Sequence, residues 1–339
     1  MAAIELTYLN GADVGGLARS DEEILGSVRT VLAEQGRRET VIEPRTHLFP
    51  RRDSGTPGFG AGHFNVLRGA TRQDAGVKVV GDFPENHRLG LPAEMALLLL
   101  MDPATGMPVA IIDATAITEM RTGAVTAIGA EHLACRGSRV LGHIGARGTA
   151  YWNVRLLCRV LPELEEIRVH SLRPESRDAF ARRLRADLDR DVRAVGDWDE
   201  CLRGADVIVE ASRLTAPEPL LLTAWVQPGA LVIPYGTVSA VELSLTDVMD
   251  KIVVDDWGQA GVGPLGALRA HVDSGRLSQD NLHAELGQIV CGAAPGRERD
   301  SERILFWHRG LSITDIALGR TLLAKALEHG AGTRLAYRS

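Results

Sequence analysis

The stretch Arg139-Val-Leu-Gly-His-Ile-Gly-Ala-Arg-Gly-Thr-Ala150 decides the fold of this chain. Residues 140–144 are short and mostly apolar, as expected for a buried parallel strand. Gly145 follows at once, with another glycine three residues later, and residues 151–161 then space their apolar side chains as a helix does. A strand, a tight glycine turn and a helix form the context in which a dinucleotide pyrophosphate binds the N–H groups of a helix start. An ordinary strand-to-helix turn uses the same residue types, because Arg147 stands where the motif usually has a glycine.

Short apolar segments recur after this turn and predict a parallel sheet. They are residues 167–172, 206–211, 230–234 and 251–256, and helical segments separate several of them. This alternation predicts an α/β fold with a Rossmann-like doubly wound parallel sheet. We expect this dinucleotide-binding domain to span residues 126–309.

Length and composition indicate a globular chain with room for two domains. The chain has 339 residues, of which 45% are hydrophobic and 24% charged, and its net charge is −6. The net negative charge argues against nucleic acid or an anionic membrane as a partner. We see no apolar run of transmembrane length and no signal-peptide pattern. The four cysteines lack metal-ligand spacing, so we expect reduced thiols, no metal site and a cytoplasmic protein.

The first third of the chain is rich in strands and predicts a second domain. Strands are expected at residues 42–49, 58–67, 76–81, 95–101 and 108–113, and helices at residues 21–35, 117–133, 260–276 and 313–329. The helix at 313–329 follows the last strand of the parallel sheet, so we expect it to pack back on the N-terminal part. This gives a strand-rich α+β domain of residues 1–125 plus 310–339.

Several separate motifs resemble the ornithine cyclodeaminase/mu-crystallin family. They are Lys78, the turn Asp102-Pro-Ala-Thr-Gly-Met-Pro108, the segment from Asp113 to Ala124 and the turn at residues 144–150. Residues 76–86, 252–257, 283–288 and 295–298 resemble one branch of that family, the 2,3-diaminopropionate biosynthesis dehydrogenases. The resemblance runs from about residue 40 to the C-terminus.

The resemblance implies an activity. It is the NAD-dependent oxidative hydrolysis of N-(2-amino-2-carboxyethyl)-L-glutamate to 2,3-diaminopropionate and 2-oxoglutarate, which would supply a siderophore or a nonribosomal peptide antibiotic. The ligand is then a small amino-acid substrate, and the strand-rich domain binds it and forms a homodimer. A strand-rich domain with open apolar edges also needs a partner to cover them.

The expected substrate carries three carboxylates, so cationic side chains must hold it. Arg45, Lys78 and Arg121 are the candidates for substrate binding. The resemblance matches Lys78 to the family's active-site lysine and Arg121 to its carboxylate-binding arginine, so both are also candidate catalytic residues. Valines flank Lys78, and a lysine with a buried stem has a lowered pKa suited to proton transfer. Each of the three also fits a plain surface position.

His283 and Glu285 are candidates for a catalytic pair that activates water, because hydrolysis of an imine benefits from a base whose pKa is near neutral. The same two residues fit the start of a capped helix. Asp315 stands at the start of the last helix, close in sequence to the glycine expected near the nicotinamide. As an acid in a first helical turn it also has a plain dipole-stabilising role.

Cofactor binding is expected at the glycine turn and at the ends of neighbouring strands. The candidate residues are Thr122, Gly145, Ala146, Arg147, Gly148, Thr149, Ser171, Arg173, Ser212, Asp255 and Gly310. An acid at the end of the second sheet strand would favour NAD, whereas this chain has Ser171 and Arg173, which suit a 2′-phosphate. The wider resemblance favours NAD, so we expect NAD and leave NADP open.

One stretch departs from the family. Ornithine cyclodeaminases carry a catalytic Asp after the fourth sheet strand, whereas residues 234–240 of this chain hold no carboxylate and have Thr237 at that place. This disfavours ornithine and lysine as substrates. The alternatives are another amino-acid dehydrogenase or cyclodeaminase of the family, acting on ornithine, lysine or alanine, and a non-catalytic, mu-crystallin-like nucleotide-binding protein.

Overall fold

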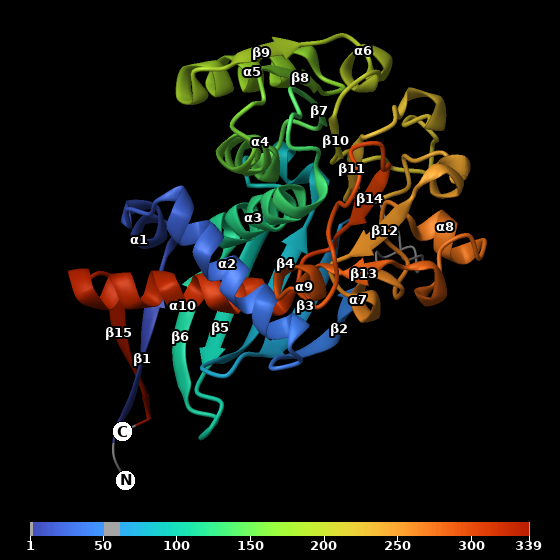
Figure 1. The fold of residues 1–339 in the computed structure, drawn as a ribbon. Helices are drawn as coiled ribbons and strands as arrows, with labels where there is room; N and C mark the ends of the chain where they lie inside the picture. The colour runs from blue at the N-terminus through green and yellow to red at the C-terminus, as the bar shows by residue number, and fades with distance from the viewer. Residues whose placement is uncertain (1–2, 51–61, 339) are drawn as a thin grey trace. The chain divides into compact units, whose positions relative to one another are not determined.

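The computed structural model of the chain describes residues 3–50 and 62–338. They form two compact units: unit 1 contains residues 1–121 and 311–339, and unit 2 contains residues 122–310. The chain leaves unit 1 within helix α3 (Thr115–Leu133) and returns to it just before helix α10 (Ser312–His329). Each unit is built on one sheet (Figure 1). The assignment of substrate binding to one unit and cofactor binding to the other stays a prediction.

Unit 1 contains a seven-stranded sheet in the order β15-β1-β6-β5-β4-β3-β2. Its neighbouring strands are antiparallel, except that β1 and β6 are parallel. The strands are β1 Ile4–Leu9, β2 Val41–Leu48, β3 His63–Ala70, β4 Ala75–Asp82, β5 Glu94–Met101, β6 Pro108–Asp113 and β15 Thr333–Arg338. Besides α3 and α10, the unit has helices α1 Gly11–Gly16 and α2 Asp21–Gly36 and the 3₁₀ turn η2 Pro84–Leu89.

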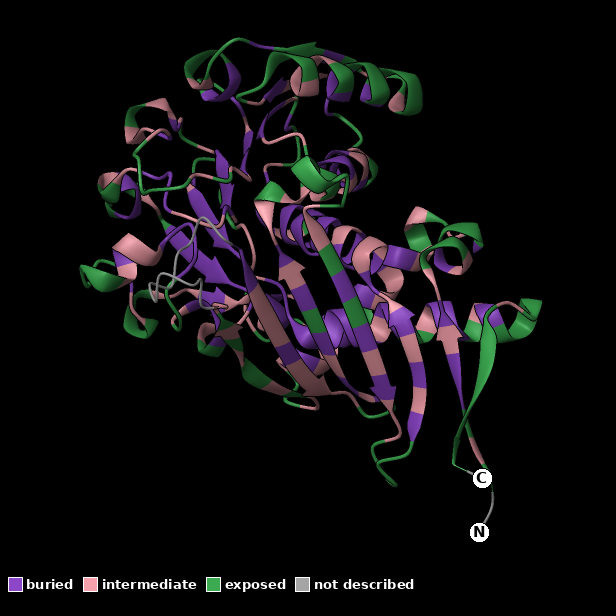
Figure 2. Ribbon diagram, turned by 180° about the vertical axis from the view of Figure 1, so that it is seen from behind, coloured by how far each residue is buried: buried purple, intermediate pink, exposed green. Residues whose placement is uncertain are grey.

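Helix α10 lies on one face of this sheet. It packs against α2 and against β3, β4 and β5, which confirms the expectation that the last helix returns to the N-terminal part. Gly76 allows the close approach, because a Cβ atom there would lie 2.8 Å from the carbonyl oxygen of Leu99 and 3.0 Å from Cγ1 of Ile316. The opposite face of the sheet carries no helix in Figure 2 and exposes large apolar side chains of β4 and β5.

Unit 2 contains an eight-stranded sheet in the order β13-β12-β14-β11-β10-β7-β8-β9, and all its pairs are parallel. The strands are β7 Val140–Ile144, β8 Glu166–His170, β9 Asp191–Ala194, β10 Val207–Glu210, β11 Leu231–Pro234, β12 Lys251–Val254, β13 Ala284–Glu285 and β14 Ile304–Trp307. The predicted doubly wound parallel sheet is therefore confirmed. The strand order reverses between β7 and β10, and ligands of such sheets bind at the carboxyl ends of strands at this point.

Short helices connect the strands of unit 2. They are α4 Gly148–Val160, α5 Pro174–Leu188, α6 Trp198–Leu202, α7 Trp257–Ala260, α8 Arg269–Asp273 and α9 Leu286–Val290, with the 3₁₀ turns η3 Thr223–Trp225, η4 Leu243–Val248 and η5 Gln279–Asn281. The large apolar side chains of the sheet are fully buried, among them Phe306 and Trp307 of β14. Burial on both faces explains why β10, β11 and β12 read as continuous apolar runs in the sequence.

Some expected elements differ in the structure. The helix predicted at residues 260–276 is wrong: only α7 and α8 form there, because Gly263 and Gly266 between them adopt φ values of 80° and 140°. Gly266 also lies against the Trp307 ring, where a Cβ atom would be 2.8 Å from Cζ2. The strand predicted at 58–67 begins at His63, and residues 58–61 lie outside the described part of the chain. Strands β1, β9 and β15 were not predicted.

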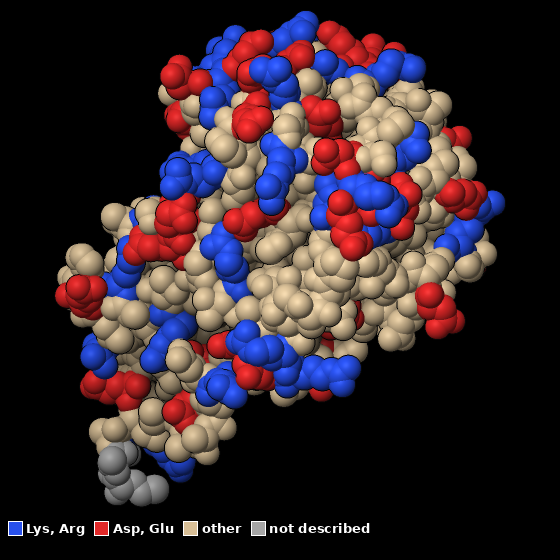
Figure 3. Space-filling view, in the orientation of Figure 1, with Lys and Arg blue, Asp and Glu red and all other residues tan. Residues whose placement is uncertain are grey.

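The described surface shows no segment suited to crossing a membrane. Within residues 3–50 and 62–338, no helix is long and apolar enough for a membrane span. On the face shown in Figure 3, basic side chains are interspersed with acidic ones.

Within residues 3–50 and 62–338, no group of three or more His, Cys, Asp or Glu side chains is placed to hold a metal ion.

The close packing of α10 on β4 predicts that Gly76 is a sensitive position. Gly76→Ala places a methyl group against Leu99 and Ile316, so we expect the free energy of unfolding to fall by about 1–3 kcal/mol. Gly15→Ala is the matched control, because a Cβ atom there meets nothing within 4 Å. Urea denaturation of both variants checks this, and equal stabilities would contradict the packing described for α10.

Candidate active site

The glycine turn of unit 2 begins at Gly145, directly after β7. Gly145 has φ 108°, a conformation that L side chains rarely adopt. A Cβ atom there would lie 2.7 Å from the carbonyl oxygen of Ala211, in the loop that follows β10. The turn after β7 and the loop after β10 therefore approach each other closely at the reversal point of the sheet, and only glycine fits between them.

Helix α4 begins in this turn and presents its N-terminus there. Its N-cap residue is Arg147, which is extended and makes no side-chain capping hydrogen bond. The first N–H groups of an α-helix have no intrahelical acceptor, and the helix dipole makes that end positive. Gly148 and Thr149 supply such N–H groups without the bulk of a large side chain. The turn and its uncapped helix therefore fit the pyrophosphate of a dinucleotide.

The end of β8 carries no acid. His170 is buried and Ser171 is half-buried, whereas Leu172 is 92% exposed and Arg173 forms the N-cap of α5. A ribose 2′-hydroxyl finds no carboxylate at these positions, and a 2′-phosphate would find an arginine and a hydroxyl. The structure thus places Ser171 and Arg173 together at this strand end, as the sequence indicated.

Three other cofactor candidates have local structural partners. Asp255 is fully buried after β12, and its Oδ2 accepts the backbone N–H groups of Arg309 at 2.8 Å and Gly310 at 2.7 Å. This contact fixes the loop that follows β14. Thr122 is buried in α3, and its carbonyl oxygen accepts a hydrogen bond from the hydroxyl of Thr126.

Glu210, the last residue of β10, was not predicted as a site residue. Its side chain is fully buried, and its Oε1 accepts the backbone N–H of Ser212 at 2.7 Å. The other carboxyl oxygen, Oε2, has no hydrogen-bond partner among the described residues. Burial raises the pKa of Glu210 to about 7, and the hydrogen bond from Ser212 opposes this shift. A charged residue directly after three apolar strand residues was the available signal.

In unit 1, three ionisable side chains from distant segments meet in one buried cluster. Lys78 lies on β4, Arg121 on α3 and Asp315 on α10. Asp315 Oδ1 accepts hydrogen bonds from Lys78 Nζ at 2.6 Å and from Arg121 Nε at 2.9 Å. Lys78 Nζ also donates a hydrogen bond to the Thr118 hydroxyl at 3.1 Å. The structure therefore brings Lys78 and Arg121 together, and it adds Asp315 as their shared partner.

This cluster holds two cationic groups and one carboxylate in a dry environment. Burial and the nearby Arg121 guanidinium lower the pKa of Lys78 to about 8, whereas Asp315 opposes this shift. Arg121 donates to Asp315 through Nε, and within residues 3–50 and 62–338 no hydrogen bond engages its two Nη groups. Asp315 Oδ2 is buried without a partner among the described residues. The excess of positive charge suits a carboxylate ligand.

Arg45 lies apart from this cluster on the sheet of unit 1. It belongs to β2, at the irregularity between Glu43 and Thr46 where the register with β3 shifts. Strand β3 lies between β2 and β4 in the sheet. Neighbouring strands are roughly 5 Å apart, so the backbone of β2 lies about 10 Å from that of β4, which carries Lys78. The structure does not bring Arg45 into the Lys78 ion cluster.

His283 and Glu285 lie at the edge strand β13 of unit 2, five strands from β7 in the sheet order. The Glu285 carboxylate accepts the backbone N–H of Trp257 at 2.9 Å and takes part in the capping box of α9. His283 Nε2 bonds to the carbonyl oxygen of Pro295 at 2.8 Å. Both side chains thus have structural partners, and they lie far from the glycine turn after β7.

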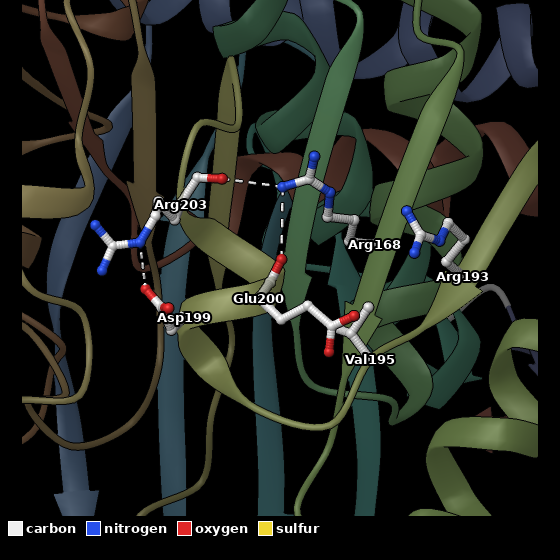
Figure 4. A pocket seen from close by; sticks show the side chains of 6 residues that line it. All are labelled: Arg168, Arg193, Val195, Asp199, Glu200 and Arg203. Carbon is white, nitrogen blue, oxygen red and sulfur yellow. Dashed lines mark hydrogen bonds and ion pairs between the residues drawn. The ribbon is translucent and has the colours of Figure 1, made fainter.

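Unit 2 also has a surface hollow of about 310 Å³ near β8, β9 and α6, shown in Figure 4. Its lining residues are Arg168, Arg193, Val195, Asp199, Glu200 and Arg203. Arg168 and Arg193 both bond to Glu166, and Arg203 bonds to Asp199. These ion pairs engage the basic groups of the hollow, and it contains none of the predicted site residues.

The buried carboxyl of Glu210 predicts a pH-dependent stability. Its pKa is about 7 in the folded chain and ordinarily 4.5, so between these values the folded chain retains a proton that the unfolded chain has lost. The stability of wild type relative to Glu210→Gln should fall as pH rises through this window, by about 1.4 kcal/mol per pH unit and about 3 kcal/mol in total. Chemical denaturation of both proteins at several pH values checks this, and a constant difference would contradict the pKa given for Glu210.

Known proteins resemble this chain in sequence. An alanine dehydrogenase of Archaeoglobus fulgidus is 32% identical over 78% of this chain and 80% of its own. The N-((2S)-2-amino-2-carboxyethyl)-L-glutamate dehydrogenase of Staphylococcus aureus is 29% identical over 77% of each chain.

Solved structures resemble it as well. The Thermococcus litoralis Delta(1)-pyrroline-2-carboxylate reductase, in complex with NADH and L-proline, has a TM-score of 0.88 at 28% identity and covers 97% of this chain and 99% of its own. An archaeal alanine dehydrogenase dimer with bound NAD also has a TM-score of 0.88 at 28% identity, covering 98% of this chain and 100% of its own.

A family match spans both units. The model of the ornithine cyclodeaminase/mu-crystallin family matches residues 8–330. This match confirms the resemblance seen in the sequence motifs, and the chain belongs to the ornithine cyclodeaminase/mu-crystallin family.

Proposed function

We propose that this chain cleaves N-(2-amino-2-carboxyethyl)-L-glutamate by NAD-dependent oxidation and hydrolysis, giving 2,3-diaminopropionate and 2-oxoglutarate. The family contains NAD-dependent amino-acid dehydrogenases and cyclodeaminases, and similar proteins act on amino-acid CH–NH bonds. The Staphylococcus aureus relative has this glutamate derivative in its name. The 2,3-diaminopropionate would then supply a siderophore or a nonribosomal peptide antibiotic.

The observation that carries this proposal is the buried Lys78–Asp315–Arg121 cluster. Two cations share one carboxylate oxygen, so a further anion stabilises the cluster. The substrate offers an α-carboxylate next to the carbon that must lose a hydride. The Nη groups of Arg121 would bind that carboxylate and fix the direction of the C–H bond.

Lys78 has a second role in this proposal. The secondary amine of the substrate must lose its proton before its lone pair can form the carbon–nitrogen double bond. With a pKa of about 8, Lys78 is mostly charged at pH 7 and is half neutral near pH 8, and its neutral form is the proton acceptor we assign. When bound, NAD accepts the hydride from the α-carbon. Water then adds to the imine, and the carbon–nitrogen bond breaks.

We assign the cofactor to unit 2, with Gly145, Gly148 and Thr149 at the pyrophosphate. NAD is proposed because NAD or NADH is bound in the neighbouring structures. Arg173 at the end of β8 favours a phosphate instead, so the affinity for NADP should be measured beside that for NAD. A cytoplasmic location, expected from the reduced cysteines, stays a prediction.

Lys78 and Arg121 should both be needed for turnover, in different ways. Loss of a charge-assisted pair costs about 2–5 kcal/mol, so Arg121→Ala should lower kcat/KM roughly 30- to 5,000-fold, with a strongly raised KM. Lys78→Ala should depress kcat more than it raises KM, because proton transfer is lost. The NAD dissociation constant should not change in either variant. Steady-state rates with the glutamate derivative, alanine, proline and ornithine test the substrate and the residues together.

Arg37→Ala is the matched control, because Arg37 belongs to unit 1 but lies in an exposed ion pair with Glu39. Thermal unfolding of each variant shows whether a lost rate reflects lost folding, and Arg121→Lys keeps the charge if Arg121→Ala unfolds. Near wild-type kcat/KM in either alanine variant would remove that residue from the site. Faster turnover of alanine than of the glutamate derivative would contradict the proposed substrate.

We also propose a homodimer formed through the sheet of unit 1. The face opposite α10 is apolar along neighbouring strands, with Val79 on β4 paired to Leu97 on β5 and Val66 on β3. Leu97 is 49% exposed, and Met95 on the same strand is 41% exposed. Contiguous exposed apolar surface of this kind marks an interface. A similar protein, the archaeal alanine dehydrogenase, is a dimer.

A charge on this face should disrupt the dimer. Leu97→Glu buries a carboxylate in the proposed interface, so we expect a monomeric mass in light scattering at micromolar protein. Leu327→Glu is the matched control, because Leu327 is equally exposed, at 49%, but lies on α10. A monomeric wild-type protein, or a Leu97→Glu protein of unchanged mass, would count against this interface.

A further inference from the structure

Glu210 lies where a ligand of unit 2 is expected. It is the last residue of β10, the neighbour of β7 at the point where the strand order reverses. Its register partners are Ile144 at the end of β7 and Pro234 at the end of β11. The carboxyl ends of these central strands border the crevice that binds ligands in doubly wound sheets. The function proposed above gives this carboxyl no role.

The Glu210 carboxyl is held in place but only half satisfied. Its Oε1 accepts the Ser212 N–H at 2.7 Å, and its own carbonyl oxygen accepts the N–H groups of Tyr235 at 2.8 Å and Gly236 at 3.1 Å. Among the described residues no hydrogen bond of good geometry reaches Oε2 or the Ser212 hydroxyl oxygen, which are both buried, although Ser212 and the Gly236 N–H lie close enough to the carboxyl to lower its pKa. Buried polar atoms without partners are costly and rare, so two of them two residues apart indicate a bound ligand or water.

The turn after β11 is shaped around this carboxyl. A Cβ atom at Gly236 would lie 2.7 Å from Oε2 and 2.8 Å from Oε1 of Glu210, so the turn passes directly over the carboxyl group in its present position. The turn itself holds no carboxylate at residues 234–240, so the carboxyl group at this place is supplied by the neighbouring strand β10.

The surroundings of Glu210 favour proton exchange near neutral pH. Tyr235 on the adjacent turn hydrogen-bonds to Thr149 and Asn153, and burial raises its pKa, so it stays neutral. His308, at the end of β14, stacks on the Tyr235 ring with centroids 4.9 Å apart. Among the described residues, the exposed Arg213 after β10 acts on Tyr235, and the buried His143 lies on the neighbouring strand β7, where burial lowers its pKa to about 4. No second carboxylate in this set competes for the proton.

We propose that Glu210 is the catalytic base that takes a proton from water in the hydrolysis of the imine, an inference that rests on the oxidative cleavage proposed above. This proposal places the nicotinamide ring in the crevice at the carboxyl end of β10; because the carbon that loses the hydride must contact that ring, Glu210 would then lie beside the carbon. The water oxygen bonds to the imine carbon, and its first proton passes to the Glu210 carboxylate, which gives an amino alcohol. The carboxylic acid returns this proton to the nitrogen, and the restored carboxylate then takes the remaining hydroxyl proton as the carbon–nitrogen bond breaks and the carbonyl forms. The released amine takes up that second proton, which leaves the ketone, the protonated amine and the free carboxylate.

The pKa of about 7 given above matches this role, because a base acts best when its pKa lies near the working pH. It also predicts which step depends on Glu210. Hydride transfer precedes hydrolysis, so loss of the base should spare the first NADH formed and slow every later turnover. A merely structural role would affect both phases alike.

The test is rapid mixing of the holoenzyme with N-(2-amino-2-carboxyethyl)-L-glutamate, following NADH formation. For Glu210→Gln we expect a first-turnover burst at the wild-type rate and a steady-state kcat lowered roughly 10²–10⁴-fold. The wild-type kcat should fall below an apparent pKa near 7, and this limb should be absent in the variant. The NAD dissociation constant should be unchanged. Glu242→Gln is the matched control, because that carboxylate caps the backbone N–H of Thr223 at 2.7 Å in the same unit.

A second variant keeps the proposal testable if glutamine folds poorly. Glu210→Ala leaves space for a small carboxylate, so added formate should restore part of the steady-state rate. A burst and a steady-state rate lowered equally, an unchanged kcat, or a shifted NAD dissociation constant would overturn the role of Glu210. If wild type oxidises alanine but not the glutamate derivative, the substrate proposal fails alone, and the same burst experiment with alanine decides on Glu210. Absence of NADH with every amino acid would overturn both.

Discussion

Lys78 and Arg121 share one oxygen of the buried Asp315 carboxylate, and unit 1 depends on this contact. The three residues come from β4, α3 and α10, so one carboxylate joins a strand and two helices. A buried ammonium without a partner costs several kcal/mol, so α10 must return to the sheet for Lys78 to be buried at all. Gly76, on the same strand as Lys78, allows that return. The stability of the fold and the chemistry proposed for the site therefore rest on the same contact.

In unit 2 as well, the packing of the fold and the candidate site depend on the same residues. Its parallel strands end in a row of polar groups, and the strand order lets the turns after β7, β10 and β11 meet. Gly145 is a glycine because the backbone of Ala211 occupies the space of a side chain, and Gly236 passes directly over the Glu210 carboxyl. The glutamate at the end of β10 is retained although its burial disfavours the charged form. Tolerance of such a group in a core is typical of functional sites.

The sequence predicted the parallel sheet and the glycine turn because both depend on local patterns. Residues 140–148 carry their strand, their turn and their helix start within one short stretch. Glu210 could not be recognised in this way, since its significance comes from its place beside Gly236, in the turn after a different strand, β11. The same limit applies to Asp315, which looked like an ordinary acid at a helix start until the fold placed Lys78 beside it. His283 and Glu285 show that residue types that suit catalysis can also have structural partners, here a helix start and a loop, so their catalytic role stays a prediction. The predicted helix at 260–276 was wrong because its apolar spacing was counted without the positive φ of Gly263 and Gly266.

Unit 1 takes its residues from both ends of the chain, and this affects how the protein is made. Asp315 leaves the ribosome 237 residues after Lys78, which at about 5–20 residues per second is an interval of roughly 10–50 s. All of unit 2 is synthesised within that interval, whereas the first sheet still lacks the helix that covers it. The second unit of the chain is thus complete before the first. A nascent chain that stops before residue 312 carries a bare apolar sheet, which is the kind of surface that chaperones bind and proteases clear.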